Sequence, residues 1–224
     1  MNETKSSNPV SSDFEAPLVT EPSGRLVFAS GAAGVTIHVA PTLAELCRAH
    51  FERHVPGVRV QGGTVTIQYR RFPLLDWLIY SLHEPLAEVT LNGSLPWEIE
   101  VRGGVSKLTA DLNGLQLVAL DVNGGASEVV VTLPRPTGTS YIRVAGGASN
   151  VTFHRPAAVA ARVRVGSGAS NLTLDEQHFG ALGGETRWET PDYKSAADRY
   201  DIEVVGGASN LTIGTITPPS TRSG

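Results

Sequence analysis

Apolar and polar residues alternate with a period of two along most of this chain. Between residues 97 and 175, pairs of apolar residues two apart lie on both sides of a short Gly-Gly-Ala-Ser block. Ile99 and Val101 precede one such block, and Leu108 and Ala110 follow it. Since a spacing of two places side chains on one face of a strand, the pattern predicts short strands with one apolar and one polar face.

The Gly-Gly-Ala-Ser block recurs at a nearly fixed interval. Its copies begin at residues 103, 124, 146, 167 and 206, and the last interval equals one period plus an insertion of 18 residues. A fixed period with one supersecondary unit per repeat is typical of a solenoid. We therefore predict an all-β fold, a single-stranded parallel β-solenoid with coils of about 21 residues. An antiparallel sandwich, in which the Gly-Gly pairs form hairpin turns, is the competing fold.

Small residues predict a tight corner between the two strands of each coil. Glycine supplies a positive φ there, and serine or asparagine can bond the local backbone. Stacked coils should align the serines into a ladder, with Asn150, Asn171 and Asn210 beside it. We expect a structural role for the corner residues, with a functional Ser/Asn surface as the alternative. These residues are Gly104, Ser106, Gly125, Ser127, Gly147, Ser149, Gly168, Ser170, Gly207 and Ser209.

The patterns divide the chain into four parts. Residues 1–23 are polar and contain Ser, Pro, Asn and Glu, so we expect a disordered tail. Residues 24–96 should form an irregular N-terminal part of the solenoid, and 97–213 the regular repeat with an insertion at 175–200. A Pro/Ser/Thr-rich flexible tail should follow at 214–224.

In one stretch of the N-terminal part the spacing of the apolar residues changes from a period of two to a helical period. Thr42 with Glu45 three residues later is a capping box, and Leu43, Leu46 and Phe51 fall on one helical stripe. We therefore predict one short capping helix near 42–54, which would cover an end or an open edge of the solenoid.

Two stretches concentrate aromatic and apolar residues. Residues 72–80 are the most apolar run, too short to span a bilayer, and they either plug the solenoid, form an oligomer contact or touch a membrane surface. The insertion either closes the end of the core or forms a binding loop. The candidate interaction residues are Phe72, Leu75, Trp77, Leu78 and Tyr80 in the first stretch and Arg187, Trp188 and Tyr193 in the second.

Charge and composition limit the class of partner and the compartment that we expect. The net charge is −4, so no basic footprint indicates nucleic acid, and we expect a protein partner, self or other. Cys47 is the only cysteine, which excludes an internal disulfide framework. The N-terminal residues show no apolar signal-peptide region, so we expect a cytoplasmic location.

The sequence carries no motif for catalysis, a cofactor or a metal. His50 and His54 are four apart, but the zinc-protease order H-E-x-x-H is absent. Carboxylates do not recur at one coil position, as a polysaccharide-cleaving site would need, apart from Glu100 and Glu203, which are far apart in the stack. There is no G-x-S-x-G elbow and no phosphate loop. We therefore predict a protein that is not an enzyme and needs no cofactor.

The repeated Gly-Gly-Ala-Ser motif and the insertion from Arg187-Trp188-Glu189-Thr190-Pro191-Asp192-Tyr193 to Asp201 resemble a bacterial family. These are the adhesin-like or toastrack-type β-helix domains, related to the C-terminal domain of cell-wall-stress response proteins. The resemblance covers roughly residues 25–213. It implies a β-solenoid and brings no catalytic residue with it.

Three functions follow as hypotheses. The first is a non-enzymatic scaffold that self-associates or binds a protein partner. The second, implied by the resemblance alone, is a cytoplasmic sensor or regulator of cell-envelope stress. The third is a polysaccharide-acting enzyme on a β-helix, against which the scattered carboxylates argue.

Overall fold

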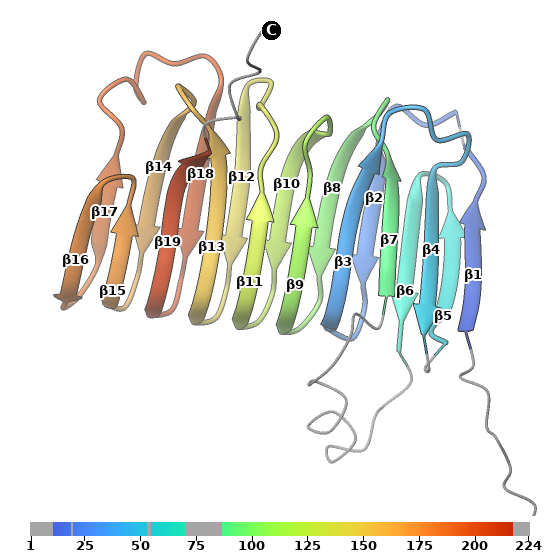
Figure 1. Ribbon diagram of the computed structural model, residues 1–224, viewed down its shortest axis with the longest axis horizontal. Coiled ribbons are helices and arrows are strands. Elements are labelled where there is room, and N and C mark those ends of the chain that lie inside the picture. The colour runs from blue at the N-terminus through green and yellow to red at the C-terminus, as the bar shows by residue number, and fades with distance from the viewer. Residues whose placement is uncertain (1–10, 19, 53–54, 70–86, 217–224) are drawn as a thin grey trace, which may run out of the picture.

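Two β-sheets face each other across one apolar core (Figure 1). The computed structural model describes residues 11–18, 20–52, 55–69 and 87–216, and these residues form strands, turns and bends without a helix. The all-β class predicted from the sequence is confirmed.

Sheet A has ten strands within the described residues. In spatial order these are β1 (Ser11–Ala16), β4 (Cys47–Glu52), β7 (Ala87–Asn92), β3 (Ala32–Ala40), β9 (Val105–Asp111), β11 (Ala126–Thr132), β13 (Ala148–Pro156), β19 (Ala208–Ile216), β15 (Ala169–Leu174) and β16 (Gln177–Leu182).

Sheet B has nine strands in the same part of the chain. In spatial order these are β17 (Thr186–Glu189), β14 (Ala160–Val165), β18 (Arg199–Val204), β12 (Thr139–Val144), β10 (Gln116–Val122), β8 (Pro96–Val101), β2 (Gly24–Phe28), β6 (Thr64–Gln68) and β5 (Gly57–Gln61).

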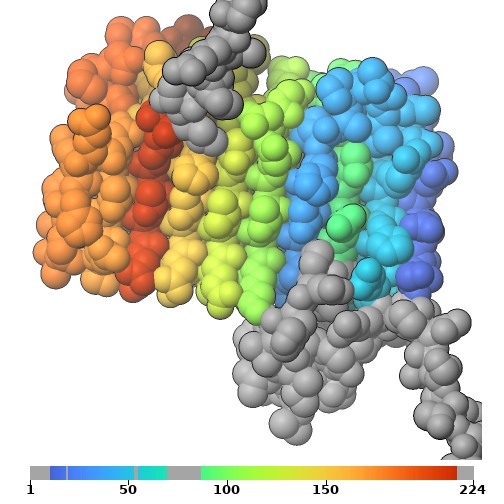
Figure 2. All heavy atoms as spheres, in the orientation of Figure 1, coloured from blue at the N-terminus to red at the C-terminus, as the bar shows by residue number. Residues whose placement is uncertain are grey.

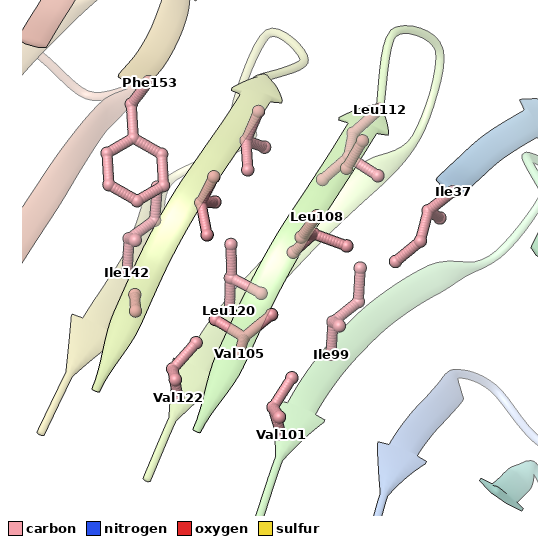
Figure 3. Close-up of a cluster of buried hydrophobic side chains, with 14 of the residues drawn as sticks. Ile37, Ile99, Val101, Val105, Leu108, Leu112, Leu120, Val122, Ile142 and Phe153 are labelled. Carbon is pink, nitrogen blue, oxygen red and sulfur yellow. The ribbon is translucent and has the colours of Figure 1, made fainter. Parts of the chain in front are cut away.

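Each coil of the repeat gives one strand to each sheet. Strand β8 leads into β9, β10 into β11, and β12 into β13, through the Gly-rich corner each time. Like strands pair in parallel and in register, so Leu108, Val129 and Val151 lie in one row. Figure 3 shows such side chains of the two sheets meeting in the core. Burying each Leu, Ile or Val there contributes about 1.5–3 kcal/mol.

The coils do not stack in the order of the sequence. Strands β14 and β15 follow β12 and β13 in the sequence but do not pair with them. The last coil, formed by β18 and β19, lies between the two coils. Strand β18 lies between β12 and β14, and β19 lies between β13 and β15. Near the other end, β2 lies between β6 and β8, and β3 lies between β7 and β9.

The single parallel solenoid is not confirmed, because both sheets are partly antiparallel. The antiparallel pairs are the outer ones: β1 with β4, β4 with β7, β5 with β6, β14 with β17, and β15 with β16. For two of these pairs, β5 with β6 and β15 with β16, the reason is the length of the link. A two-residue turn, Asp175-Glu176, joins β15 to β16, and so short a link permits only antiparallel pairing.

The capping helix predicted near 42–54 is also corrected over its described residues. Cys47–Glu52 forms β4, in which Cys47, Ala49 and Phe51 are buried while Arg48 is exposed. This period of two prevails over the local capping box because β4 pairs along its length with both β1 and β7. Pairing on both edges satisfies the backbone groups that a helix would have satisfied internally.

The limits of the two predicted tails also shift. Residues 11–16, expected within a disordered tail, form β1, and Ala16 is fully buried in the core. At the other end β19 continues to Ile216, three residues beyond 213, the predicted end of the repeat. Residues 217–224 lie outside the described part of the chain.

Candidate interaction surfaces

Hydroxyl and amide side chains form rows on the outer face of sheet A over β9, β11, β13, β19 and β15; this face is turned toward the viewer in Figure 2. The repeat places like residues in rows across β9, β11, β13, β19 and β15, about 4.8 Å apart from strand to strand. One row holds Ser106, Ser127, Ser149, Ser209 and Ser170, and another holds Thr109, Val130, Thr152, Thr212 and Thr173. We call the outer surface of these five strands the hydroxyl face.

An asparagine ladder runs between the serine and threonine rows. The side-chain amide of Asn171 donates a hydrogen bond to Asn210, and the Asn210 amide donates one to Asn150 at 2.7 Å. All three residues have φ of 53°, the left-handed conformation that asparagine tolerates. Lys107 and Glu128 occupy the same position in β9 and β11 with φ of 52°, where their longer side chains give no such local compensation.

The close stacking of the corners explains the first glycine of several blocks. A Cβ on Gly124 would lie 2.5 Å from the carbonyl carbon of Gly103, and one on Gly206 would lie 2.7 Å from the Gly146 oxygen. A Cβ on the second glycine, Gly125, would meet only the Gly147 oxygen at 3.4 Å. The sequence shows both glycines equally, so only the structure reveals that Gly124 and Gly206 have less room for a side chain than Gly125.

A shallow depression of about 520 Å³ lies over the corners of β13, β19 and β15. It brings Ser149, Ser170 and Ser209 together with Ser167 and the turn after β16. Its lining residues are Gly147, Ala148, Ser149, Ser167, Gly168, Ala169, Ser170, Leu182, Gly183, Gly207, Ala208 and Ser209. Since none of these carries a charge or an imidazole, the depression offers hydroxyl and backbone hydrogen bonds alone.

Ion pairs cover the outer face of sheet B. Asp121, Arg143, Glu203 and Arg164 lie in one row on β10, β12, β18 and β14, with alternating sign. Arg143 lies 3.6 Å from both Asp121 and Glu203, and Arg164 lies 3.6 Å from Glu203. We call the outer surface of β8, β10, β12, β18 and β14 the charged face.

Asp201 is the buried centre of the charged face, with 7% of its surface exposed. Arg162 binds its carboxylate through two guanidinium nitrogens, and Arg164 approaches it at 3.8 Å. The guanidinium of Arg162 also lies 4.7 Å from the centre of the Tyr193 ring, and Arg199 lies 5.2 Å from it. Sequence reasoning missed this cluster because its charged members are 39 residues apart and only the register brings them together.

The structure separates the three candidate residues of the insertion. Tyr193 is buried with 5% exposure, and burial is the main cause that raises its pKa. Trp188 is half-buried against the core, and its indole nitrogen donates to the Gln177 side chain at 3.2 Å. Arg187 is exposed and pairs with Glu185 at 2.7 Å. The candidates Phe72, Leu75, Trp77, Leu78 and Tyr80 lie outside the described residues.

The titratable groups Cys47 and His50, near the N-terminal end, have surroundings typical of structural residues. Burial raises the pKa of the Cys47 thiol to about 12, which keeps it protonated. His50 lies 2.6 Å from Asp13, and this hydrogen bond raises the pKa of the imidazole. Across the described ranges no group of three acidic, histidine or cysteine side chains is placed to hold a metal. In the same ranges no helix is long and apolar enough to cross a membrane.

Comparison with known proteins supports the relationship suggested by the repeat. A solved structure described as "a putative cell adhesion protein" from Clostridium sporogenes ATCC 15579 is similar, with a TM-score of 0.71 and 16% identity over 93% of this chain and 100% of that one. Another, "a putative adhesin" from Bacteroides fragilis NCTC 9343, has a TM-score of 0.36 and 10% identity over 94% of this chain and 98% of that one. No curated protein matches. Residues 58–154 match the family model of the N-terminal domain of toast_rack, DUF2154, which supports the toastrack-type resemblance seen in the sequence.

Proposed function

We propose that this chain is a non-enzymatic interaction protein that binds protein through its hydroxyl face, with a second copy of itself as one partner. The adhesin-like family suggests a structural or interaction role of this kind. The proposal adds the surface, the class of partner and the way in which the surface is used.

The observation behind the proposal is the contrast between the two outer faces. On the charged face the side chains of neighbouring strands already pair with one another. On the hydroxyl face no ion pair joins neighbouring strands within the described residues, and Val130 is 41% exposed in the middle of the threonine row. Lys107 and Glu128 lie on this face, but the serine, asparagine and threonine rows carry no charge across β13, β19 and β15. A partner surface can therefore pack over these three strands without stripping water from charges, which is the costly part of burying a polar surface.

Two matched variants test the proposal by light scattering behind a sizing column. Val130→Lys places a charge on the hydroxyl face, and Val118→Lys places the same charge on β10 of sheet B at a similar exposure, 38% against 41%. We expect the mass of the wild type to rise with concentration, Val130→Lys to weaken this rise, and Val118→Lys to leave it unchanged.

Equal behaviour of the two lysine variants would contradict a role for the hydroxyl face. A wild type that stays monomeric at every concentration would contradict self-association. Capture of another protein by the wild type and Val118→Lys, but not by Val130→Lys, would then support a different partner on the same face.

The cellular setting stays a prediction. A cytoplasmic location follows from the sequence expectation alone, and fractionation of cells that make the tagged chain would test it. A role in cell-envelope stress rests on the resemblance alone.

A further inference from the structure

The last coil of the chain occupies a slot between two earlier coils. Strand β18 pairs with β12 on one side and β14 on the other, and β19 pairs with β13 and β15. Both edges of both strands are therefore paired, and Tyr200, Ile202 and Leu211 are fully buried between the sheets. The segment 199–216 is held as a core element although it follows the coils on both sides of it in the sequence.

The slot matches the last coil in charge and in shape. On sheet B the slot is bordered by Arg143 of β12 and Arg164 of β14, and the last coil places Glu203 between them at 3.6 Å from each. On sheet A the asparagine of β19 completes the ladder between Asn150 and Asn171. Without this coil the two arginines would lack the carboxylate that separates them, so the slot selects this segment over a generic strand.

The connection to the last coil is long for the gap that it spans. Nine residues, 190–198, join β17 to β18, which are separated only by β14. Thr190 and Tyr193 hold the start of this connection against β14. Two strand spacings are about 10 Å, whereas the five residues from 194 to 198 reach about 17 Å when extended. The part of this connection from 194 to 198 is largely exposed. The segment 199–216 can therefore reach a neighbouring molecule without disturbing the coil formed by β14 and β15.

We propose that segment 199–216 is exchanged between two copies of this chain, so that the slot of one copy holds the last coil of the other. The inference rests on the proposed function, since it supplies a mechanism for self-association. Every contact of the last coil forms again between the copies, including the hydrogen bond from the Tyr200 hydroxyl to the Pro134 oxygen. Exchange of identical elements needs no new interface, which makes it a low-cost route to a dimer.

Engineered disulfides on the charged face report which chain supplies β18. Arg143→Cys/Glu203→Cys links β12 to β18, and the control Asp121→Cys/Arg143→Cys links β10 to β12, with one position shared. Neighbouring strands are about 4.8 Å apart, within the range that a disulfide spans. Cys47 is buried with a raised pKa, so it does not compete. Each variant is refolded at low and high concentration, oxidised, and run on a non-reducing gel.

We expect covalent dimers from Arg143→Cys/Glu203→Cys, several-fold more abundant after refolding at high concentration, and internally linked monomers from the control. Internally linked monomers from both variants would overturn the exchange. A third variant, Arg164→Cys/Glu203→Cys, should also give dimers. If it gave only monomers while the first variant gave dimers, β14 would move together with β18, and the exchanged segment would not be 199–216.

The two proposals fail in different experiments. The cysteine positions lie on the charged face, so they leave Val130 and the threonine row unaltered. Reversible association that Val130→Lys weakens, together with internal disulfides only, would retain the proposed function and reject the exchange. Covalent dimers together with equal behaviour of Val130→Lys and Val118→Lys would retain the exchange and reject the hydroxyl face as the binding surface.

Discussion

The hydroxyl face and the charged face belong to the same coils but follow different rules. On the hydroxyl face each row repeats one kind of residue, because threonine, serine and asparagine can stack like on like. On the charged face the sign alternates from Asp121 through Arg143 and Glu203 to Arg164, although Glu100 lies opposite Asp121 and Arg187 lies opposite Arg164 at the two ends of the row. A simple sequence repeat can therefore produce the first face, whereas the second needs a different residue in each coil.

This difference explains the order of the coils. If β14 paired directly with β12, as the sequence order suggests, the register would place Arg143 opposite Arg164. With β18 between them, Glu203 separates the two arginines. The uncharged rows would accept either order, so of the two faces only the charged one favours the observed order at β12, β18 and β14.

The largest expected effect is at the corner that joins the two faces. Gly124→Ala places a methyl group 2.5 Å from the backbone of Gly103, so unfolding free energy should fall by about 3 kcal/mol or more. Gly125→Ala meets only an ordinary contact at 3.4 Å and should cost less than about 1 kcal/mol. Denaturant unfolding of both variants measures the difference, and similar losses would mean that corner stacking is not what selects the first glycine.

Asp201→Asn probes the buried centre of the charged face. The substitution leaves Arg162 and Arg164 without their shared carboxylate, and we expect a loss of about 2 kcal/mol. Glu203→Gln, at a side chain that is 36% exposed, should cost less than about 1 kcal/mol. Thermal unfolding at equal ionic strength compares the two. A larger loss for Glu203→Gln would show that burial does not rank the ion pairs of this face.

Glu128→Asn should stabilise the hydroxyl face. Glu128 has φ of 52° beside the asparagine ladder, and left-handed backbone costs an ordinary residue about 1–2 kcal/mol. Asparagine tolerates this conformation, so we expect a gain of about 1 kcal/mol and a higher Tm. Glu128→Gln removes the charge without relieving the backbone and should leave Tm nearly unchanged. Equal gains from the two variants would assign the effect to charge.

The smallest expected effect is a dependence of stability on pH at the edge of the charged face. The hydrogen bond from Arg102 is the largest cause that lowers the pKa of Glu100, and Arg25 contributes to it. A carboxyl whose folded pKa is lowered stabilises the fold above its unfolded pKa, about 4.3, and loses that contribution as the pH falls through the folded value. Glu100→Gln should therefore lower stability at pH 7 and flatten its decline on acidification. Parallel unfolding curves of the two proteins from pH 7 to pH 3 would contradict this role.

The aromatic candidates of the insertion show which surface features the sequence could predict. The concentration of Trp and Tyr in the insertion predicted either a cap on the core or a binding loop. In the structure Trp188 packs against the core and Tyr193 lies under two arginines. Asp201 and Arg162 escaped notice because nothing in the sequence links positions 39 residues apart before the register is known.

The sequence by itself determined the repeating unit. Alternation with a period of two produced strands with one buried face, and the Gly-Gly-Ala-Ser block marked each corner. The recurrence of asparagine after the serine predicted that Asn150, Asn171 and Asn210 would lie beside the serine ladder. These features are local, so one coil is enough to reveal them.

Tertiary structure alone decided which coil lies next to which and what closes the ends. Every coil offers its neighbours nearly the same backbone and the same apolar rows, so the repeat does not encode an order. Charges that meet only after stacking favour the observed order at the last coil, where Glu203 lies between Arg143 and Arg164. At the ends, open backbone edges needed partners, and this need turned residues 47–52 into a paired strand instead of a helix.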